Sequence, residues 1–245
     1  MHARENRKIV PFVKTVAKID GNVVTINTSK NNLGWGYEGQ ERLPKPWWTV
    51  VSTAFIFETP EGPCVTLVKR EGKTRHSGKW ALLPAGATDN ICELLHPEEA
   101  MYREIEEEFV LFHNGKQVDP MEFSVLLTKG RVEIRNEKAP SRNNKTSGEL
   151  YIKDGRVYLI RAYKINLQLD QVIIYDGEED PCGNPFDRLV AIVPLDKLNN
   201  QVMPVALFKS KKRHNPRLID LSCYQTDTLE WLRENANRLH KLILS

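Results

Sequence analysis

The chain has 245 residues, 40% of them hydrophobic, and a formal net charge of +3. This composition is typical of a globular protein, and no apolar run approaches the ~20 residues that a membrane-spanning helix needs. The charged residues 1–8 are not followed by an apolar segment, so we expect no secretory signal and a cytoplasmic protein without a membrane partner. The small positive charge is compatible with an anionic substrate but does not by itself indicate nucleic-acid binding.

The N-terminal segment, residues 1–46, is predicted to be an extension that precedes the core. Asp20-Gly21 is a two-residue hairpin signal between the β-prone runs 15–19 and 22–26. The residues that follow, 29–46, are rich in Gly, Asn, Lys and Pro and are predicted to form a loop. The core domain is predicted to span residues 47–245.

The first half of the core is predicted to begin with an antiparallel strand pair. β-Branched and aromatic residues dominate 49–58 and 64–70, and a Pro-Glu-Gly turn joins the two runs. A basic loop over 70–79 and a short strand over 80–83 follow. A turn then leads to a helix that Pro97 opens, because proline is well tolerated in the first helical turn.

The second half of the core is predicted to alternate strands with polar loops. The expected strands are 122–127, 130–134, 149–153, 156–167 and 189–193. The polar run 137–147 is predicted to be an exposed, mobile loop, and 176–187 an acidic loop. The last element is an amphipathic helix over 229–243, with Asp227 and Glu230 as its N-cap and capping-box pair.

Cysteine spacing and one basic cluster bear on possible partners. The cysteines form no Cys-x-x-Cys pair, which argues against a structural zinc site and favours reduced thiols; they are Cys64, Cys92, Cys182 and Cys223. The strongest basic cluster is predicted to be a solvated loop and comprises Lys209, Lys211, Lys212, Arg213 and Arg217. It leaves RNA open as an alternative partner, although no aromatic residue is interleaved for base stacking.

The most informative stretch is Arg-Glu-Ile-Glu-Glu-Glu at 103–108. On an α-helix Glu104, Glu107 and Glu108 share one face, at i, i+3 and i+4, whereas Glu106 points away. Three clustered carboxylates suit a hard divalent cation such as Mg²⁺ or Mn²⁺, although a charge run alone is as typical of a solvated face. An apolar stripe on another side is formed by Met101, Ile105 and Phe109.

This stretch and its surroundings resemble the box of the Nudix hydrolases. Gly86 corresponds to the leading glycine, and Arg103-Glu104-Ile105-Glu106-Glu107-Glu108-Phe109-Val110-Leu111 corresponds to the second half. The lead-in Trp-Ala-Leu-Leu-Pro-Ala-Gly and the helix start Pro-Glu-Glu-Ala also resemble the family. The chain departs from the pattern by three inserted residues between Gly86 and Arg103, by Leu95 in place of the middle glutamate, and by Val110 in place of the late glycine.

The resemblance implies an α/β (α+β) Nudix fold, with a mixed β-sheet sandwiched between helices, an N-terminal extension and a C-terminal helix. It implies a Mg²⁺-dependent (or Mn²⁺-dependent) pyrophosphohydrolase that cleaves the diphosphate linkage of a nucleoside diphosphate linked to another group. The substrate would then be a small nucleotide. Two alternatives stay open: a nucleotide-binding or regulatory module without hydrolysis, and an RNA-directed, decapping-type enzyme.

The resemblance also implies roles for individual residues. Glu107 and Glu108 would be metal ligands, and Glu104 either a further ligand or the general base. The carbonyl of Gly86 would be another ligand, and Arg103 would orient the glutamates through charge-assisted hydrogen bonds. One more acidic ligand or base is expected from a downstream loop, where the candidates are Glu178, Glu179, Asp180 and Asp187.

Substrate contacts are predicted from the cations just upstream of the helix. Arg70, Arg75 and Lys79 are the predicted phosphate contacts, with Lys69 and Lys73 as further candidates. The extension and the C-terminal helix leave open a homodimer surface or a substrate lid.

Overall fold

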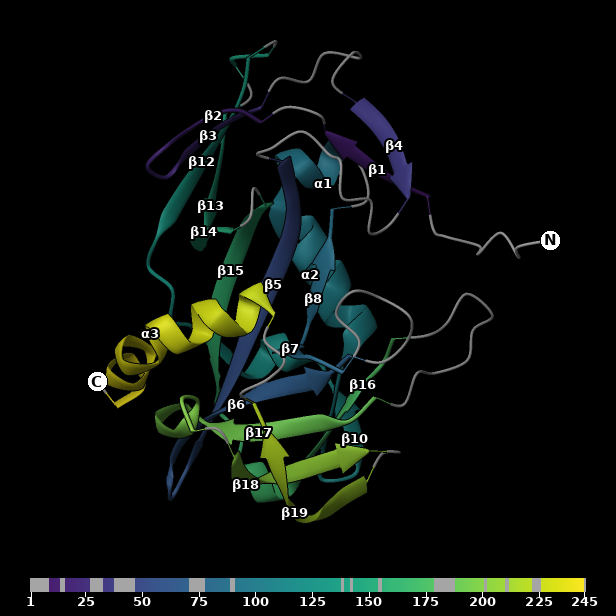
Figure 1. Cartoon of the computed structure of the whole chain (residues 1–245), viewed down its shortest axis with the longest axis vertical. Helices are drawn as coiled ribbons and strands as arrows, with labels where there is room; N and C mark the ends of the chain where they lie inside the picture. Colours follow the sequence, from purple (N-terminus) through teal and green to yellow (C-terminus); the bar gives the residue numbers. More distant parts are fainter. Residues whose placement is uncertain are drawn as a thin grey trace, which may run out of the picture. The chain divides into compact units, whose positions relative to one another are not determined.

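The fold is α+β and dominated by β-strands, with an α-helix at its C-terminal end (Figure 1). This confirms the predicted class. The computed structural model describes residues 9–13, 16–26, 33–37, 47–70, 78–88, 91–137, 139–141, 143–153, 156–178, 188–200, 202–209, 212–221 and 226–244. The predicted boundary after residue 46 stays a prediction, because residues 38–46 lie outside the described ranges.

The chain forms two compact units that both draw on distant parts of the sequence. The first unit contains Met1–Val51, Gly86–Ala100 and Gly130–Leu159. The second unit contains Ser52–Ala85, Met101–Lys129 and Ile160–Ser245.

A mixed sheet lies in the first unit. Its described strands, in the order β13-β12-β3-β2, are β13 (Asn144–Ser147), β12 (Arg131–Asn136), β3 (Val23–Ile26) and β2 (Val16–Asp20). β12 and β3 run parallel, whereas the outer pairs are antiparallel. Alternate residues of β3 and β12 are buried, so this sheet has one face in the core. The remaining described elements of this unit include β1 (Ile9–Val13), β4 (Leu33–Tyr37) and β14 (Glu149–Lys153).

The predicted N-terminal hairpin is present, with its turn one residue later than expected. Asp20 lies opposite Val23, so Gly21 and Asn22 form the turn. Gly21 has a φ of 56°, a left-handed conformation that glycine adopts without strain. The prediction of a loop over 29–46 is wrong at β4, which pairs with β1 in an antiparallel ladder.

The polar run 137–147 is also not a loop throughout, because its last residues form β13. Thr146 is buried, and the Asn144 side chain donates a hydrogen bond to the Leu95 carbonyl at 2.9 Å. Gly148 N donates to Gly130 O at 2.9 Å and extends the β12–β13 ladder beyond the Arg131–Ser147 pair. Polar residues can occupy an edge strand, so composition alone favoured the wrong assignment here.

A larger sheet, most of which belongs to the second unit, has the order β11-β15-β5-β6-β17-β18-β19. Its strands are β11 (Ser124–Leu126), β15 (Arg156–Ile165), β5 (Trp47–Thr59), β6 (Gly62–Lys69), β17 (Val190–Pro194), β18 (Val202–Lys209) and β19 (Lys212–Asp220). β7 (Trp80–Leu82) adds to β6 beside this path. The predicted β5–β6 hairpin is confirmed, with Thr59 opposite Gly62.

The basic cluster is a strand pair rather than the predicted solvated loop. β18 and β19 pair antiparallel, and Lys212 to Leu218 are all exposed along β19 (Figure 1). β19 is the last strand of the sheet order, and cations on an edge strand discourage pairing with another chain. Lys211 lies outside the described residues.

A small antiparallel sheet in the second unit was not predicted as such. Its order is β10-β9-β16, with β10 (Lys116–Val118), β9 (Phe109–His113) and β16 (Val172–Asp176). Short 3-10 turns flank it at η2 (Pro120–Phe123) and η3 (Leu169–Gln171). Asp176 lies opposite Phe109, so the end of β16 meets the start of β9.

The predicted central helix is α2 (Pro97–Glu108). Met101 and Ile105 are buried as predicted, but Phe109 is not on the helix: it is the first residue of β9. Its ring still packs in the core, 4.3 Å from the Phe55 ring between centroids. The lengthened segment between Gly86 and Arg103 contains a short helix, α1 (Ile91–Leu95), which belongs to the first unit.

The C-terminal helix is α3 (Asp227–Leu244), in agreement with the prediction (Figure 1). Leu229, Leu232, Ala236, Leu239 and Ile243 are buried, at the spacing of one helical face. This face packs on β7 and on the turn η4 (Leu195–Lys197). Among the described residues, no helix has the length and apolar character to cross a membrane.

The N-cap of α3 is Thr226, one residue before the predicted Asp227. Its hydroxyl accepts a hydrogen bond from Leu229 N at 3.4 Å and donates to the Trp80 carbonyl at 2.9 Å. The predicted Asp227 N-cap is therefore wrong, because the helix starts at Asp227 itself. The hydrogen bond from Thr226 to the Trp80 carbonyl also connects the start of α3 to β7, the strand that precedes the box.

Thr226→Val should therefore lower the free energy of unfolding by about 1–2 kcal/mol, since it removes the cap and a buried donor at unchanged shape. Urea unfolding is the measurement, and Thr226→Ser is the matched control because it keeps the hydroxyl. Equal stabilities of the valine and serine variants would contradict this assignment of the cap.

Candidate functional site

The site is built around the turn that follows β7. Trp80, Ala81 and Leu82 are buried, which anchors the strand. The Pro84 carbonyl then accepts a hydrogen bond from Thr53 N at 3.0 Å, which fixes the turn against β5. As a result Ala85 N–H is aimed at α2, where it donates to Glu108 Oε2 at 2.9 Å.

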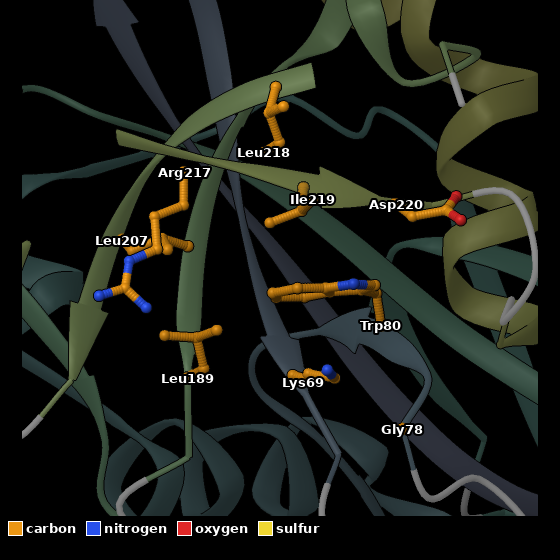
Figure 2. Close-up of a pocket in the computed structure, with 9 residues that line it drawn as sticks. All are labelled: Lys69, Gly78, Trp80, Leu189, Leu207, Arg217, Leu218, Ile219 and Asp220. Atoms are coloured by element: carbon orange, nitrogen blue, oxygen red, sulfur yellow. The ribbon is translucent and has the colours of Figure 1, made fainter. Parts of the chain in front are cut away.

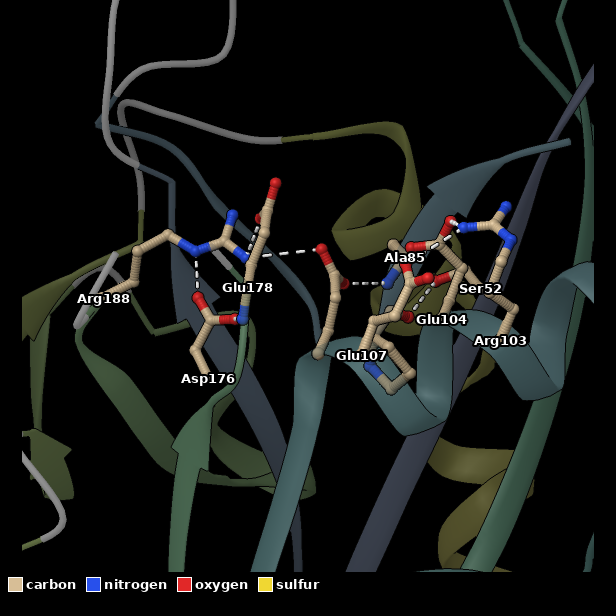
Figure 3. Close-up of polar contacts among 10 residues, drawn as sticks. Ser52, Ala85, Arg103, Glu104, Glu107, Asp176, Glu178 and Arg188 are labelled. Carbon is tan, nitrogen blue, oxygen red and sulfur yellow. Dashed lines mark hydrogen bonds and ion pairs between the residues drawn. The ribbon is translucent and has the colours of Figure 1, made fainter. Parts of the chain in front are cut away.

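The three predicted ligands on α2 differ in their surroundings. Glu104 and Glu108 are buried, whereas the Glu107 side chain is 57% exposed. Arg103 contacts two of them: its Nη1 lies 2.7 Å from Glu104 Oε1 and 3.2 Å from Glu107 Oε2 (Figure 3). The roles predicted for these residues in catalysis stay predictions.

Glu108 is paired with an arginine that sequence reasoning missed. Arg188 is buried just before β17, and its Nη2 lies 3.3 Å from Glu108 Oε1. Its guanidinium is also paired with the carboxylates of Asp176 and Glu178 (Figure 3). Of the predicted downstream acids, Glu178 therefore reaches the site, whereas Glu179, Asp180 and Asp187 lie outside the described residues.

Asp176 and Glu178 reach Arg188 because β16 ends very close to the end of α2. Gly177 N donates to Glu108 O at 2.9 Å. A Cβ atom at Gly177 would lie 2.5 Å from the Glu107 carbonyl oxygen and 2.7 Å from a Val110 methyl group. Only glycine permits this approach, so Gly177 places the acids on either side of it beside the box.

The electrostatics of the site favour an added cation. Among the described residues, five carboxylates pair with two guanidinium groups in two clusters, and these paired groups carry a formal charge of 2 − 5 = −3. Burial raises the pKa of Glu108 well above its ordinary value, and the charge of Glu104 adds to this while Arg188 opposes it. Burial alone would lower the pKa of Arg188, but its pairing with Asp176 and the other carboxylates raises that pKa.

These residues fit a divalent cation that is shared with a substrate. Among the described residues, no three acidic, histidine or cysteine side chains gather as an all-protein metal cage. Mg²⁺ does not require one, because it keeps several waters and binds through one or two carboxylates plus substrate phosphates. Glu104 and Glu108 supply such carboxylates, and the excess negative charge supplies the attraction.

The predicted substrate contacts are only partly described. Arg70 N donates to Lys79 O at 2.9 Å, so these two residues face each other at the neck of the loop between β6 and β7. Arg75 and Lys73 lie outside the described residues. Gly86 is in β8 (Ala85–Ala87) and belongs to the first unit, so its predicted role as a metal ligand stays a prediction.

A cavity of about 500 Å³ opens in the second unit beside that neck (Figure 2). It combines apolar walls with two cations, Lys69 and Arg217, and one acid, Asp220. Lys69 was among the further phosphate candidates, but the contribution of β19 was missed. The lining consists of Lys69, Gly78, Trp80, Leu189, Leu207, Arg217, Leu218, Ile219 and Asp220.

Comparisons with known proteins find similarity at the level of structure alone. No family model and no curated protein matches the sequence. The NUDIX domain of Shewanella oneidensis NrtR, complexed with ADP-ribose, aligns with a TM-score of 0.40 and 17% identity over 78% of this chain and 86% of that chain. A Nudix hydrolase from M. smegmatis, RenU, aligns with a TM-score of 0.40 and 16% identity over 78% of this chain and 88% of that chain. Both carry the Nudix name, the family that the box resembles.

Proposed function

We propose that this protein is a Nudix-type pyrophosphohydrolase that uses Mg²⁺ or Mn²⁺ to cleave the diphosphate linkage of a nucleoside diphosphate linked to another group. The observation that carries the proposal is the pair of buried carboxylates, Glu104 and Glu108, one helical turn apart on α2. One of them is held by the Ala85 N–H of the preceding turn. A solvated acidic face would have neither the burial nor the backbone partner.

Glu104, Glu107 and Glu108 are the residues that would hold the cation. The chemistry supplied by a bound divalent cation is neutralisation of the diphosphate charge and activation of water. Glu104 is the proposed general base if it is not a ligand, since it lies beside the cation-binding carboxylates and carries a charge that can accept a proton. Arg103 contacts both Glu104 and Glu107, and these two contacts restrict the rotation of the two glutamate side chains.

Recognition of the nucleotide is proposed to involve Arg70 and Lys79. A backbone hydrogen bond joins these two residues at the neck of the loop. Lys69, the last residue of β6 and the residue before Arg70, lines the cavity beside them. Cations around an apolar cavity suit a ligand with an anionic part and a planar organic part. The partner is therefore a small nucleotide, and a homodimer stays a prediction.

The test is hydrolysis of a substrate panel in the presence of Mg²⁺, Mn²⁺ or EDTA. The panel contains sugar nucleotides, dinucleoside polyphosphates, NAD-like dinucleotides, nucleoside triphosphates and capped RNA. Turnover of one class that requires the metal would support the proposal and identify the substrate class. If no class is hydrolysed with either metal, the hydrolase proposal is wrong.

A second function, a nucleotide-binding module without hydrolysis, has one observation in its favour. Arg103 and Arg188 already pair with the box carboxylates and offset part of their negative charge. In that case a nucleotide would raise the melting temperature of the protein but would be recovered intact. For capped RNA, binding through the exposed cations of β19 would weaken steeply as salt rises.

A further inference from the structure

Glu104, Glu107 and Glu108 each have a guanidinium partner, but the two arginines come from different parts of the chain. Arg103 is on α2 and reaches its own neighbours, Glu104 and Glu107. Arg188 is 80 positions away from Glu108 and reaches it from the start of β17. Glu108 therefore takes its guanidinium partner from a distant part of the chain, whereas Glu104 and Glu107 take theirs from α2.

The guanidinium of Arg188 is itself fixed. It is paired through Nε with Asp176, whose side chain is fully buried, and through Nη2 with Glu178. Because a guanidinium is planar and forked, two carboxylates at different nitrogens determine both its position and its plane. The close approach of Gly177 to α2 holds the two acids in place.

Both oxygens of Glu108 are held as a consequence. Oε2 accepts from Ala85 N at 2.9 Å, and Oε1 faces Arg188 Nη2 at 3.3 Å. Two donors on two oxygens fix the plane of the carboxylate, yet an ionised carboxylate has room for about four such contacts. The contacts that remain possible then have fixed directions rather than directions averaged over rotamers.

We infer that Arg188 is a positioning residue that acts through Glu108, fixing the orientation in which this carboxylate meets a divalent cation. The expected effect of Arg188 on turnover rests on the proposed function. The contact between Arg188 and Glu108 does not depend on that function. The segment before β17 would then supply the residue that orients Glu108, which no described residue of the box supplies.

The test uses Arg188→Lys, which keeps the charge and removes the fork. Mn²⁺ binding, followed through the EPR signal of the free ion, is expected to weaken about tenfold, and kcat to fall about tenfold or more. KM for the nucleotide, measured at saturating Mn²⁺, is expected to change less than about threefold, because the substrate contacts are untouched. The matched control is Arg161→Lys, since Arg161 on β15 is about as buried as Arg188 and donates to the Tyr163 hydroxyl.

A double-mutant cycle in EDTA tests the same contact without metal or substrate. Glu108→Gln and Arg188→Lys are combined, and a coupling of about tenfold in the unfolding equilibrium constant is expected. Absence of coupling, or an Arg188→Lys protein that binds Mn²⁺ and turns over like the parent, overturns the inference. If the parent neither binds Mn²⁺ nor hydrolyses any substrate, the proposed function fails, and the cycle alone decides whether Arg188 positions Glu108.

Discussion

Glu107→Gln is expected to lower metal-dependent turnover at least about hundredfold while the melting temperature stays within about 2 °C of the parent. The two effects separate because the side chain of Glu107 is exposed and its ion-pair partner among the described residues is Arg103, on its own helix. An exposed i, i+4 ion pair adds little to stability. The charge of the carboxylate, in contrast, is what a hard cation binds.

The matched control is Glu106→Gln, which removes the same charge from the neighbouring position. Glu106 is exposed on α2 as well, but it lies away from Glu104 and Glu108. Initial rates with saturating Mg²⁺ and with EDTA are compared for the parent and both variants. If Glu107→Gln hydrolyses as fast as Glu106→Gln, the assignment of the metal-binding face of α2 is wrong.

What the sequence could predict is the local part of this site. Helical periodicity places Glu104, Glu107 and Glu108 on one face, and it also predicts burial of Met101 and Ile105. These patterns repeat within a few residues, so one segment carries the whole signal. The same reason explains why the β5–β6 hairpin and α3 were predicted correctly.

What could not be predicted is the part made by tertiary contacts. Nothing in the sequence around Arg188 shows that its partner is Glu108, because an ion pair across 80 positions has no periodicity. Asp176 was assigned to an acidic loop, although the apolar run before it is consistent with a strand, and it is the last residue of β16. The one local signal that could have helped is Gly177, a glycine directly after an apolar run, which often marks a close backbone approach.

Two departures from the family pattern, the longer segment before Arg103 and Val110 in place of glycine, lie in regular secondary structure. The segment between Gly86 and Arg103, which is three residues longer than the family pattern, contains α1, whose Leu94 is buried, so this part of the box is folded rather than an extended loop. Val110 stands where the family has glycine, and it lies in β9 one residue after the helix ends. The chain therefore passes from α2 directly into a strand, which brings β16 and its acids to the box.

Arg188→Met is expected to lower the free energy of unfolding by about 3–5 kcal/mol, the usual effect of removing one partner from a buried ion pair. The side chain of Arg188 is only 6% exposed, and its loss leaves the fully buried carboxylate of Asp176 without its partner. Urea unfolding in EDTA measures the change, so that no metal can substitute for the missing charge. Adding Asp176→Asn to Arg188→Met should recover part of the stability, because the orphaned charge is then removed too.

The comparison that decides this prediction is Arg135→Met, which breaks the Arg135–Glu133 pair on β12. Both arginines pair with a carboxylate, but the side chain of Arg135 is 51% exposed, so solvent replaces the lost partner there. A loss at Arg188 no larger than at Arg135 would mean that solvent also reaches the network around Glu108. The buried carboxylates would then have no need of a cation, and the electrostatic argument for a metal at this site would lose its basis.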